Sequence, residues 1–180
     1  MNKDNIILIG MPGAGKSTVG VVLAKKLGYA FMDSDLVIQN RAGRLLHEII
    51  EEQGIEGFWA VEEETNASID VHKTVIATGG SAVYGSRAME HFRQIGTVVY
   101  LKLSCEAIAD RLGDLNERGV TLREGQTLPE LYAERVPLYE KYADITIDCE
   151  ELSIREVVEL IHSCIISANL QKITVKNKRQ

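Results

Sequence analysis

Short apolar runs along the chain alternate with longer segments in which apolar residues recur every three or four positions. Residues 5–9 are nearly all apolar and lead into a glycine, which is typical of a strand buried on both faces of a parallel sheet. Residues 18–27 carry their apolar side chains at helical spacing, and Gly28 follows as a stop signal. The pattern predicts a central strand, a loop and a helix, in that order.

The same alternation continues to the end of the chain. Further strands are expected at residues 29–33, 74–77, 98–103 and 145–147, and helices at 45–52, 58–69, 105–112, 128–142 with an interruption near Pro137, and 153–168. Short strands that alternate with helices predict an α/β fold, a three-layer sandwich with a parallel sheet covered on both faces.

Two segments lack this periodicity. Residues 113–126 are polar and punctuated by glycines, which favours a lid-like loop. Residues 170–180 are expected to form a flexible basic tail. A chain of 180 residues is too short for two domains of ordinary size, so we expect one domain over residues 1–169.

The charge balance limits the classes of partner. A net charge of -6 and a pI near 5.3 argue against a broad basic face for nucleic acid or an anionic membrane. No apolar run reaches the roughly 18 residues that a membrane helix needs. Cys105, Cys149 and Cys164 lie far apart, as expected for reduced thiols in a cytosol. We therefore expect a cytoplasmic protein that works as a monomer on a small molecule.

A phosphate-binding loop is the strongest signal in the sequence. Residues 10–17 read Gly-Met-Pro-Gly-Ala-Gly-Lys-Ser and match the pattern G-x-x-x-x-G-K-[ST] between the expected first strand and first helix. Lys16 is expected to reach the β- and γ-phosphates of a nucleotide, and the Ser17 hydroxyl to ligate Mg²⁺. The remaining residues expected to contact the nucleotide here are Gly13, Ala14, Gly15 and Thr18.

Two carboxylates follow the second expected strand. Asp33 and Asp35 are two positions apart, so both can face one cleft beyond the carboxyl ends of the strands. One could position Mg²⁺ while the other accepts a proton from an acceptor hydroxyl. The alternative is a pair that only caps the next helix by accepting hydrogen bonds from its free N–H groups.

Four segments together resemble the shikimate kinase family in order and spacing, over roughly residues 5 to 150. They are Gly-Lys-Ser-Thr-Val-Gly at 15–20, Asp-Ser-Asp at 33–35, Ala-Thr-Gly-Gly at 77–80, and Arg-Val-Pro-Leu-Tyr at 135–139 with Ala-Asp following at 143–144. The resemblance implies a nucleoside-monophosphate-kinase-like fold with a five-stranded parallel sheet of order 2-3-1-4-5, an acceptor-binding insert at about 34–70 and the lid at 113–126. It also implies transfer of the γ-phosphoryl group of ATP to a ring hydroxyl of shikimate, a step of aromatic amino-acid biosynthesis.

The resemblance assigns roles to the acceptor-site residues. Asp33 would hold Mg²⁺ through water, and Asp35 would bind the acceptor hydroxyls and act as the base. Gly79 and Gly80 would contact the substrate through their backbone, and Arg135 would bind its carboxylate. Taken alone, Arg135 could instead be an exposed helix arginine paired with a neighbouring glutamate.

Two further arginines complete the implied nucleotide site. Arg111 would lie against the adenine, and Arg118 would close over the phosphates from the lid, tasks that suit a planar cation. In isolation, an arginine beside a glycine-rich loop is more often a solvated surface residue.

The sequence departs from the family at the acceptor site. The family has an arginine that shares the substrate carboxylate with Arg135, but Trp59 stands at that position here. A charge-assisted bond contributes roughly 1.5 to 3 kcal/mol, so shikimate should bind about 10- to 100-fold more weakly than with both arginines. Ser81 replaces the third glycine of the usual Gly-Gly-Gly, and the lid reads Arg-Gly-Val-Thr from Arg118. Trp59 either shapes the substrate site or is a structural tryptophan.

Besides a nucleoside monophosphate kinase, which only analogy with the fold suggests, three functions remain open from the sequence. The first is a shikimate kinase, and the second is the same chemistry on another small hydroxylated acceptor that is less anionic or more apolar. The third is a regulator that binds or hydrolyses ATP without phosphorylating an acceptor. The presence of Asp35, Arg118 and Arg135 disfavours the regulator, because such a protein needs none of them at an acceptor site.

Overall fold

The computed structural model describes residues 3–112, 123 and 125–177, and of residues 168–177 the backbone only. In chain order the elements are β1 (Asn5–Ile9), α1 (Lys16–Leu27), β2 (Ala30–Asp33), α2 (Ser34–Ala42), α3 (Leu46–Ala67), β3 (Thr74–Ala77), the 3-10 turn η1 (Ala82–Tyr84), α4 (Ser86–Ile95), β4 (Gly96–Lys102), α5 (Cys105–Leu112), α6 (Leu128–Tyr142), β5 (Ile145–Asp148) and α7 (Ile154–Asn177).

The five strands form one parallel sheet of order β2-β3-β1-β4-β5, which confirms the fold expected from the sequence. β1 lies at its centre, with Ile7 opposite Ile76 of β3 and Val98 of β4. Every residue of β1 is buried. A strand that is covered on both faces has no need for alternating polar residues, which explains its nearly continuous apolar run.

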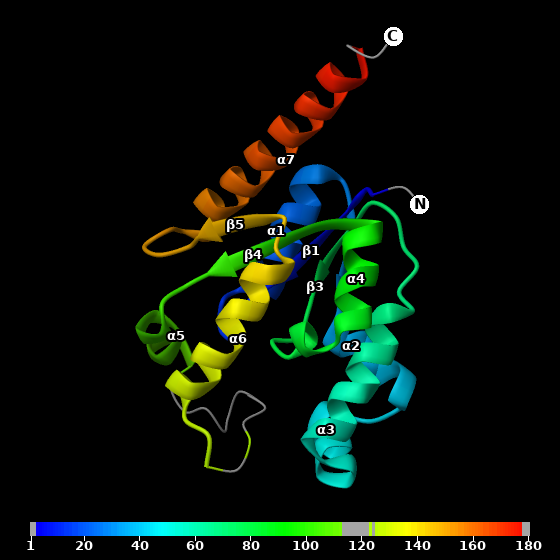
Figure 1. Ribbon diagram of the computed structural model, residues 1–180, viewed down its shortest axis with the longest axis vertical. Coiled ribbons are helices and arrows are strands. Elements are labelled where there is room, and N and C mark those ends of the chain that lie inside the picture. The colour runs from blue at the N-terminus through cyan, green and yellow to red at the C-terminus, as the bar shows by residue number, and fades with distance from the viewer. Residues whose placement is uncertain (1–2, 113–122, 124, 178–180) are drawn as a thin grey trace.

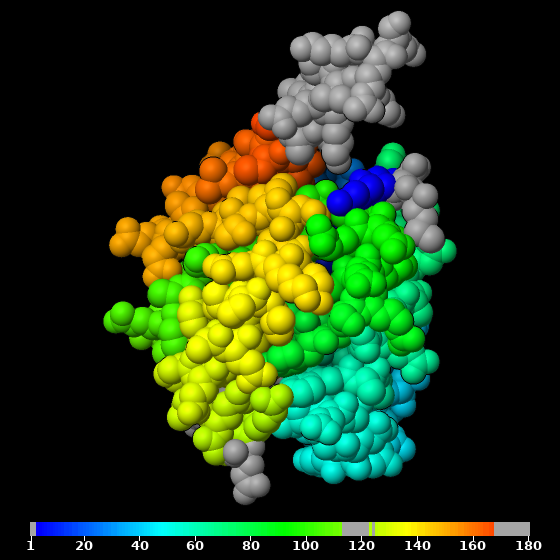
Figure 2. Space-filling view, in the orientation of Figure 1, coloured from blue at the N-terminus to red at the C-terminus, as the bar shows by residue number. Residues whose placement is uncertain are grey.

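Helices cover both faces of the sheet. In Figure 1, α4 and α6 lie in front of the strands, while α1 lies behind them and packs against α7 and β3. α3 packs on α2, α4 and η1 at one end of the sheet, within the segment expected as the acceptor-binding insert. On the face drawn in Figure 2, α6 (yellow) and α3 (cyan) reach the surface side by side.

Two helices were not anticipated from the sequence. α4 buries Ala88, Met89, Phe92 and Ile95, an amphipathic pattern that lies between Gly85 and Gly96. α2 has only nine residues and buries only Ser34 and Ile38, so its apolar signal is weak. It begins at Ser34, directly after Asp33, the last residue of β2, so no loop separates the two elements.

Other boundaries differ in informative ways. The two helices expected at 45–52 and 58–69 are both present within α3, on either side of a kink at Gly54, whose φ of 71° lies in the left-handed region. The expected interruption near Pro137 is wrong, because α6 continues through it. α7 runs to Asn177, nine residues past the expected end at Ala168.

Of the described helices, none is long and apolar enough to cross a membrane.

Candidate active site

The phosphate-binding loop joins the end of β1 to the start of α1. Gly13 and Gly15 have φ values of 79° and 89°, in the left-handed region that glycine adopts without a Cβ penalty. Gly15 is the N-cap of α1 and offers no side chain to the helix end, so the first N–H groups of α1 remain available to a ligand. The loop therefore has the backbone shape that anion binding requires.

Lys16 is buried beneath this loop. Its Nζ atom donates hydrogen bonds to the carbonyl oxygens of Gly10 at 2.8 Å and Met11 at 2.9 Å. Burial lowers the pKa of the ammonium group to about 8, and the nearby negative charge of Asp35 opposes that shift. The side chain is thus held inside the loop as a cation at neutral pH.

Asp33 joins the phosphate loop to the start of α2. Its Oδ2 atom accepts a hydrogen bond of 2.7 Å from the Ser17 hydroxyl, and its Oδ1 atom accepts one of 3.0 Å from the backbone N–H of Asp35. The helix-capping role considered from the sequence is therefore present, and one carboxylate oxygen is still directed at Ser17. A hydroxyl and a carboxylate side by side are hard oxygen donors of the kind that fit Mg²⁺.

Asp35 and Glu62 form a pair of carboxyl groups beyond the end of β3, and Glu62 is buried while Asp35 is partly buried. Burial is the main cause that raises the pKa of Asp35 to about 6 and that of Glu62 to about 7. The Ser81 hydroxyl donates a 2.6 Å hydrogen bond to Oε2 of Glu62. Asp35 Oδ1 and Glu62 Oε1 are buried with no hydrogen-bond partner in the described protein. These two atoms are therefore poised to accept bonds from a polar ligand.

Sequence reasoning missed Glu62. It is the first of three consecutive glutamates, which reads as a solvated helix face. The available signal was helical spacing, because Glu62 lies one turn after Phe58 on the buried face of α3.

The backbone of Gly79 and Gly80 lies between the two carboxylates and the phosphate-binding loop. A Cβ on Gly79 would lie 2.5 Å from Glu62 Oε1 and 2.7 Å from Asp35 Oδ1. A Cβ on Gly80 would lie 2.7 Å from the Pro12 ring and 3.1 Å from Arg135 Nη1. Both positions therefore need a residue without a side chain if the surrounding groups are to stay where they are.

Arg135 enters the same region from α6. It is 0% exposed, so the alternative of an exposed helix arginine is wrong. Its Nε atom donates to the Tyr84 hydroxyl at 3.2 Å. One turn further along α6, the Tyr139 hydroxyl donates to the Gly80 carbonyl at 2.6 Å and ties the helix to the glycine segment.

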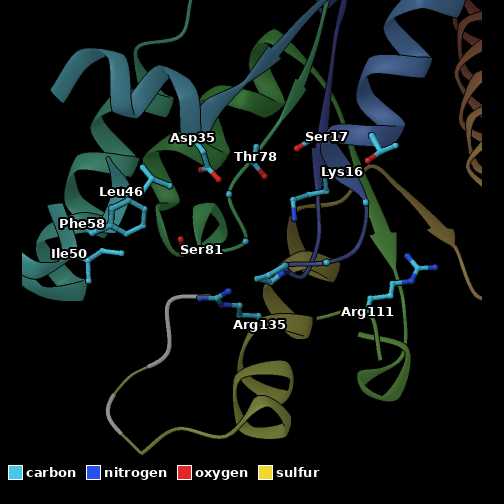
Figure 3. A pocket seen from close by; sticks show the side chains of 16 residues that line it. Lys16, Ser17, Asp35, Leu46, Ile50, Phe58, Thr78, Ser81, Arg111 and Arg135 are labelled. Atoms are coloured by element: carbon cyan, nitrogen blue, oxygen red, sulfur yellow. The ribbon is translucent and has the colours of Figure 1, made fainter. Parts of the chain in front are cut away.

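One cavity of about 530 Å³ unites these groups. Figure 3 shows Lys16, Asp35 and Arg135 around a common space, with Leu46, Ile50 and Phe58 forming an apolar wall on one side. Of the residues expected from the sequence, those that line it are Gly13, Gly15, Lys16, Ser17, Thr18, Asp35, Gly79, Gly80, Arg111 and Arg135.

Of the other expected residues, Asp33 contacts Ser17 at the edge of this site, and three lie elsewhere or are not described. Ala14 lines an adjoining cavity of about 440 Å³ that shares Arg111 and Thr18 with the first and is partly walled by α7. Trp59, which is expected to contact the acceptor, is not among the residues that line the large cavity; its ring lies against that of Tyr84 at an angle of 40°. Arg118 lies outside the described residues.

Comparisons with known proteins agree with this geometry. The family model described as shikimate kinase matches residues 12–166. A shikimate kinase of Thiobacillus denitrificans is 38% identical over 164 residues, which cover 89% of each chain.

Solved structures agree as well. The structure of an Acinetobacter baumannii shikimate kinase in complex with shikimate superposes with a TM-score of 0.84 at 35% identity, covering 93% of this chain and 95% of that one. The structure of an Aquifex aeolicus shikimate kinase superposes with a TM-score of 0.78 at 31% identity, covering 92% of this chain and 98% of that one. The chain therefore belongs to the shikimate kinase family, ATP-using phosphotransferases that act on an alcohol group.

Proposed function

We propose that this protein transfers the γ-phosphoryl group of ATP to a ring hydroxyl of shikimate, giving shikimate 3-phosphate and ADP. The observation that carries the proposal is a single cavity lined both by the phosphate-binding loop and by Asp35 and Arg135. A protein that only binds or hydrolyses ATP has no need for the Asp35 carboxylate and the buried Arg135 guanidinium next to its phosphate loop.

Each group has a chemical task in this proposal. The acceptor hydroxyl gives its proton to Asp35 as its oxygen bonds to the γ-phosphorus, while the bond from that phosphorus to the β–γ bridging oxygen breaks and ADP leaves. Lys16 and the N–H groups of the loop stabilise the charge on the transferring group. Arg135 binds the carboxylate of shikimate and fixes its ring relative to Asp35.

Mg²⁺ fits the oxygen donors at the loop. Ser17 Oγ would ligate it, and Asp33 would hold it through water, since their side chains are in contact. When bound, Mg²⁺ would neutralise phosphate charge during the transfer. Arg111 is proposed to lie against the adenine, because it lines both the large cavity and the adjoining one. For Arg118, a role over the phosphates stays a prediction.

We also propose that the protein works as a monomer in the cytoplasm. The residues that line the candidate site all come from one chain, and the three cysteines are unpaired, as is usual in a reducing compartment. A second candidate acceptor is another small hydroxylated molecule that is more apolar than shikimate. The apolar wall of Leu46, Ile50 and Phe58 and the presence of tryptophan at position 59 favour it.

Product analysis tests the proposal. The protein is incubated with Mg²⁺, ATP and shikimate or one of a panel of polyols and hydroxy acids, and phosphorylated products are identified by mass spectrometry and phosphorus NMR. We expect a phosphate ester on shikimate. An ester on another acceptor and none on shikimate would establish the second candidate, and ADP without any ester would favour a nucleotide hydrolase.

A further inference from the structure

Trp59 and Tyr84 form an aromatic pair behind the cavity. Trp59 belongs to α3 and Tyr84 to η1, and their ring centres lie 4.5 Å apart at an angle of 40°. Neither residue lines the cavity that holds Asp35. This distance is within the range at which aromatic rings attract each other, so the pair joins the two elements directly.

A guanidinium group lies against each ring of this pair. Arg123 Cζ is 5.1 Å from the ring centre of Trp59, and Arg135 Cζ is 5.2 Å from that of Tyr84. Both distances are within the range of a cation–π interaction. We call the four residues Arg123, Trp59, Tyr84 and Arg135 the arginine–aromatic stack. Arg123, at one end of the stack, is half-exposed, and Arg135, at the other end, is fully buried.

Polar interactions connect the same two arginines by a second route. Arg135 Nε donates to the Tyr84 hydroxyl at 3.2 Å, and the Glu134 carboxylate lies close enough to that hydroxyl to interact with it electrostatically. Glu134 in turn accepts bonds from Arg123 Nη1 at 3.1 and 3.2 Å and from Gln126 Nε2 at 2.9 Å. Tyr84 belongs to both routes, through its ring and through its hydroxyl.

These contacts fix the direction of the Arg135 side chain. Tyr84 engages its Nε edge and one face, while its Nη1 atom lies near Gly80 at the cavity. A flexible arginine loses rotamer entropy when it captures an anion, and one that is already held in place loses less. The affinity of a pocket that binds an anion through such a guanidinium therefore depends on the residues that hold the guanidinium in place.

We propose that Trp59, Tyr84 and Arg123 are positioning residues that hold Arg135 ready for the anionic group of the acceptor. Trp59 then controls acceptor affinity without touching the acceptor. The inference rests on the proposed function, because it takes the acceptor to carry an anion such as the carboxylate of shikimate.

Substitution at Trp59 tests the inference through the split between KM and kcat. In Trp59→Leu we expect the KM for shikimate to rise about tenfold, with kcat and the KM for ATP within about twofold. Trp59→Phe keeps an aromatic ring and should stay within about threefold of the wild type for shikimate. Arg93→Met, which removes an exposed arginine on α4 away from the stack, is the control and should change nothing.

Two further measurements separate positioning from general packing. The carboxamide of shikimate lacks the anion, so Trp59→Leu should change its KM by less than about twofold. Equal effects on both acceptors, or an equal rise in the KM for ATP, would overturn the inference. If Trp59→Leu does not fold, Arg123→Met removes only the half-exposed end of the stack. It should raise the KM for shikimate about threefold, and an unchanged KM would again contradict the inference.

The fluorescence of Trp59 gives a readout that needs no turnover, because it is the single tryptophan of the chain. Shikimate should change its emission in the wild type, and the change should fall by more than half in Tyr84→Leu. If shikimate produces neither turnover nor an emission change, the choice of acceptor fails, and the inference with it. If turnover is normal, but shikimate does not change the Trp59 emission of the wild type and the KM of Trp59→Leu equals that of the wild type, only the proposed role of the arginine–aromatic stack is contradicted.

Discussion

The carboxylates of Asp35 and Glu62 approach the same glycine from two different helices. Asp35 lies in the first turn of α2 and Glu62 in α3, and a Cβ on Gly79 would be 2.7 Å from Asp35 Oδ1 and 2.5 Å from Glu62 Oε1. Burial raises the pKa of both groups, and the charge of Asp35 raises that of Glu62 further. Ser81, at the end of the same glycine segment, donates a hydrogen bond to Glu62.

Gly79→Ala should therefore damage the acceptor site and spare the nucleotide site. The new methyl group would displace both carboxylates, and a misplaced base costs on the order of 10²-fold in rate. We expect kcat/KM for shikimate to fall by about that factor, while the affinity for an ATP analogue, measured by calorimetry, stays within about twofold. A comparable loss of nucleotide affinity would mean that the substitution disturbs the whole site, which the geometry does not predict.

Asp35→Asn tests the proposed base. An amide keeps the shape of the side chain but cannot accept the acceptor proton, and general base catalysis typically contributes 10²- to 10⁴-fold. We expect acceptor-dependent ADP release to fall by about this range. Asp70→Asn, an exposed aspartate after α3, is the matched control and should be fully active. Near-normal activity of Asp35→Asn would remove Asp35 from the mechanism.

The pH dependence of kcat/KM follows from two shifted groups. Asp35 must be ionised to accept a proton, and its pKa is raised to about 6, so activity should rise with pH through that value. Lys16 must be protonated, and its pKa is lowered to about 8, so activity should fall above it. A steady-state profile between pH 5 and 9 checks this bell shape. The residual activity of Asp35→Asn should not show the rise with pH near 6. If that rise is unchanged, it is caused by the titration of another group.

Glu62 should make folding stability depend on pH. Burial raises its pKa from 4.5 to about 7, so the folded state favours the neutral form. The stability that this contributes is complete below pH 4.5 and is lost as the pH rises through about 7. Glu62→Gln is neutral at all pH values and can still accept the Ser81 hydrogen bond.

The melting temperature of Glu62→Gln minus that of the wild type should therefore increase by roughly 2–4 °C or more between pH 4.5 and pH 8. Calorimetric scans of both proteins at the two pH values measure this difference. A constant difference would show that Glu62 has the same pKa in the folded and the unfolded state.

Local sequence patterns predicted the nucleotide half of the site because they determine local geometry. The spacing of Gly10, Gly15 and Lys16 specifies a loop that turns around an anion, whatever the rest of the chain does. The sheet order was also predicted, although from the family resemblance, and the structure confirms it.

The back of the acceptor site could not be predicted in this way. Tyr84 and Arg123 belong to no motif, and they meet Trp59 only because α3, η1 and the segment before α6 converge in three dimensions. Trp59 was recognised as a departure from the family, but its sequence position cannot say that its ring faces Tyr84 and not the cavity.

The most direct test of the account is the rate of ADP release by the wild type with Mg²⁺, ATP and saturating shikimate, with Lys16→Ala as the blank. We predict release that depends on shikimate and disappears in Lys16→Ala, because a buried ammonium group inside the phosphate loop cannot be replaced by a methyl group. Release that is the same with and without shikimate, or that persists in Lys16→Ala, would contradict the assignment of this cavity as a site of phosphoryl transfer to shikimate.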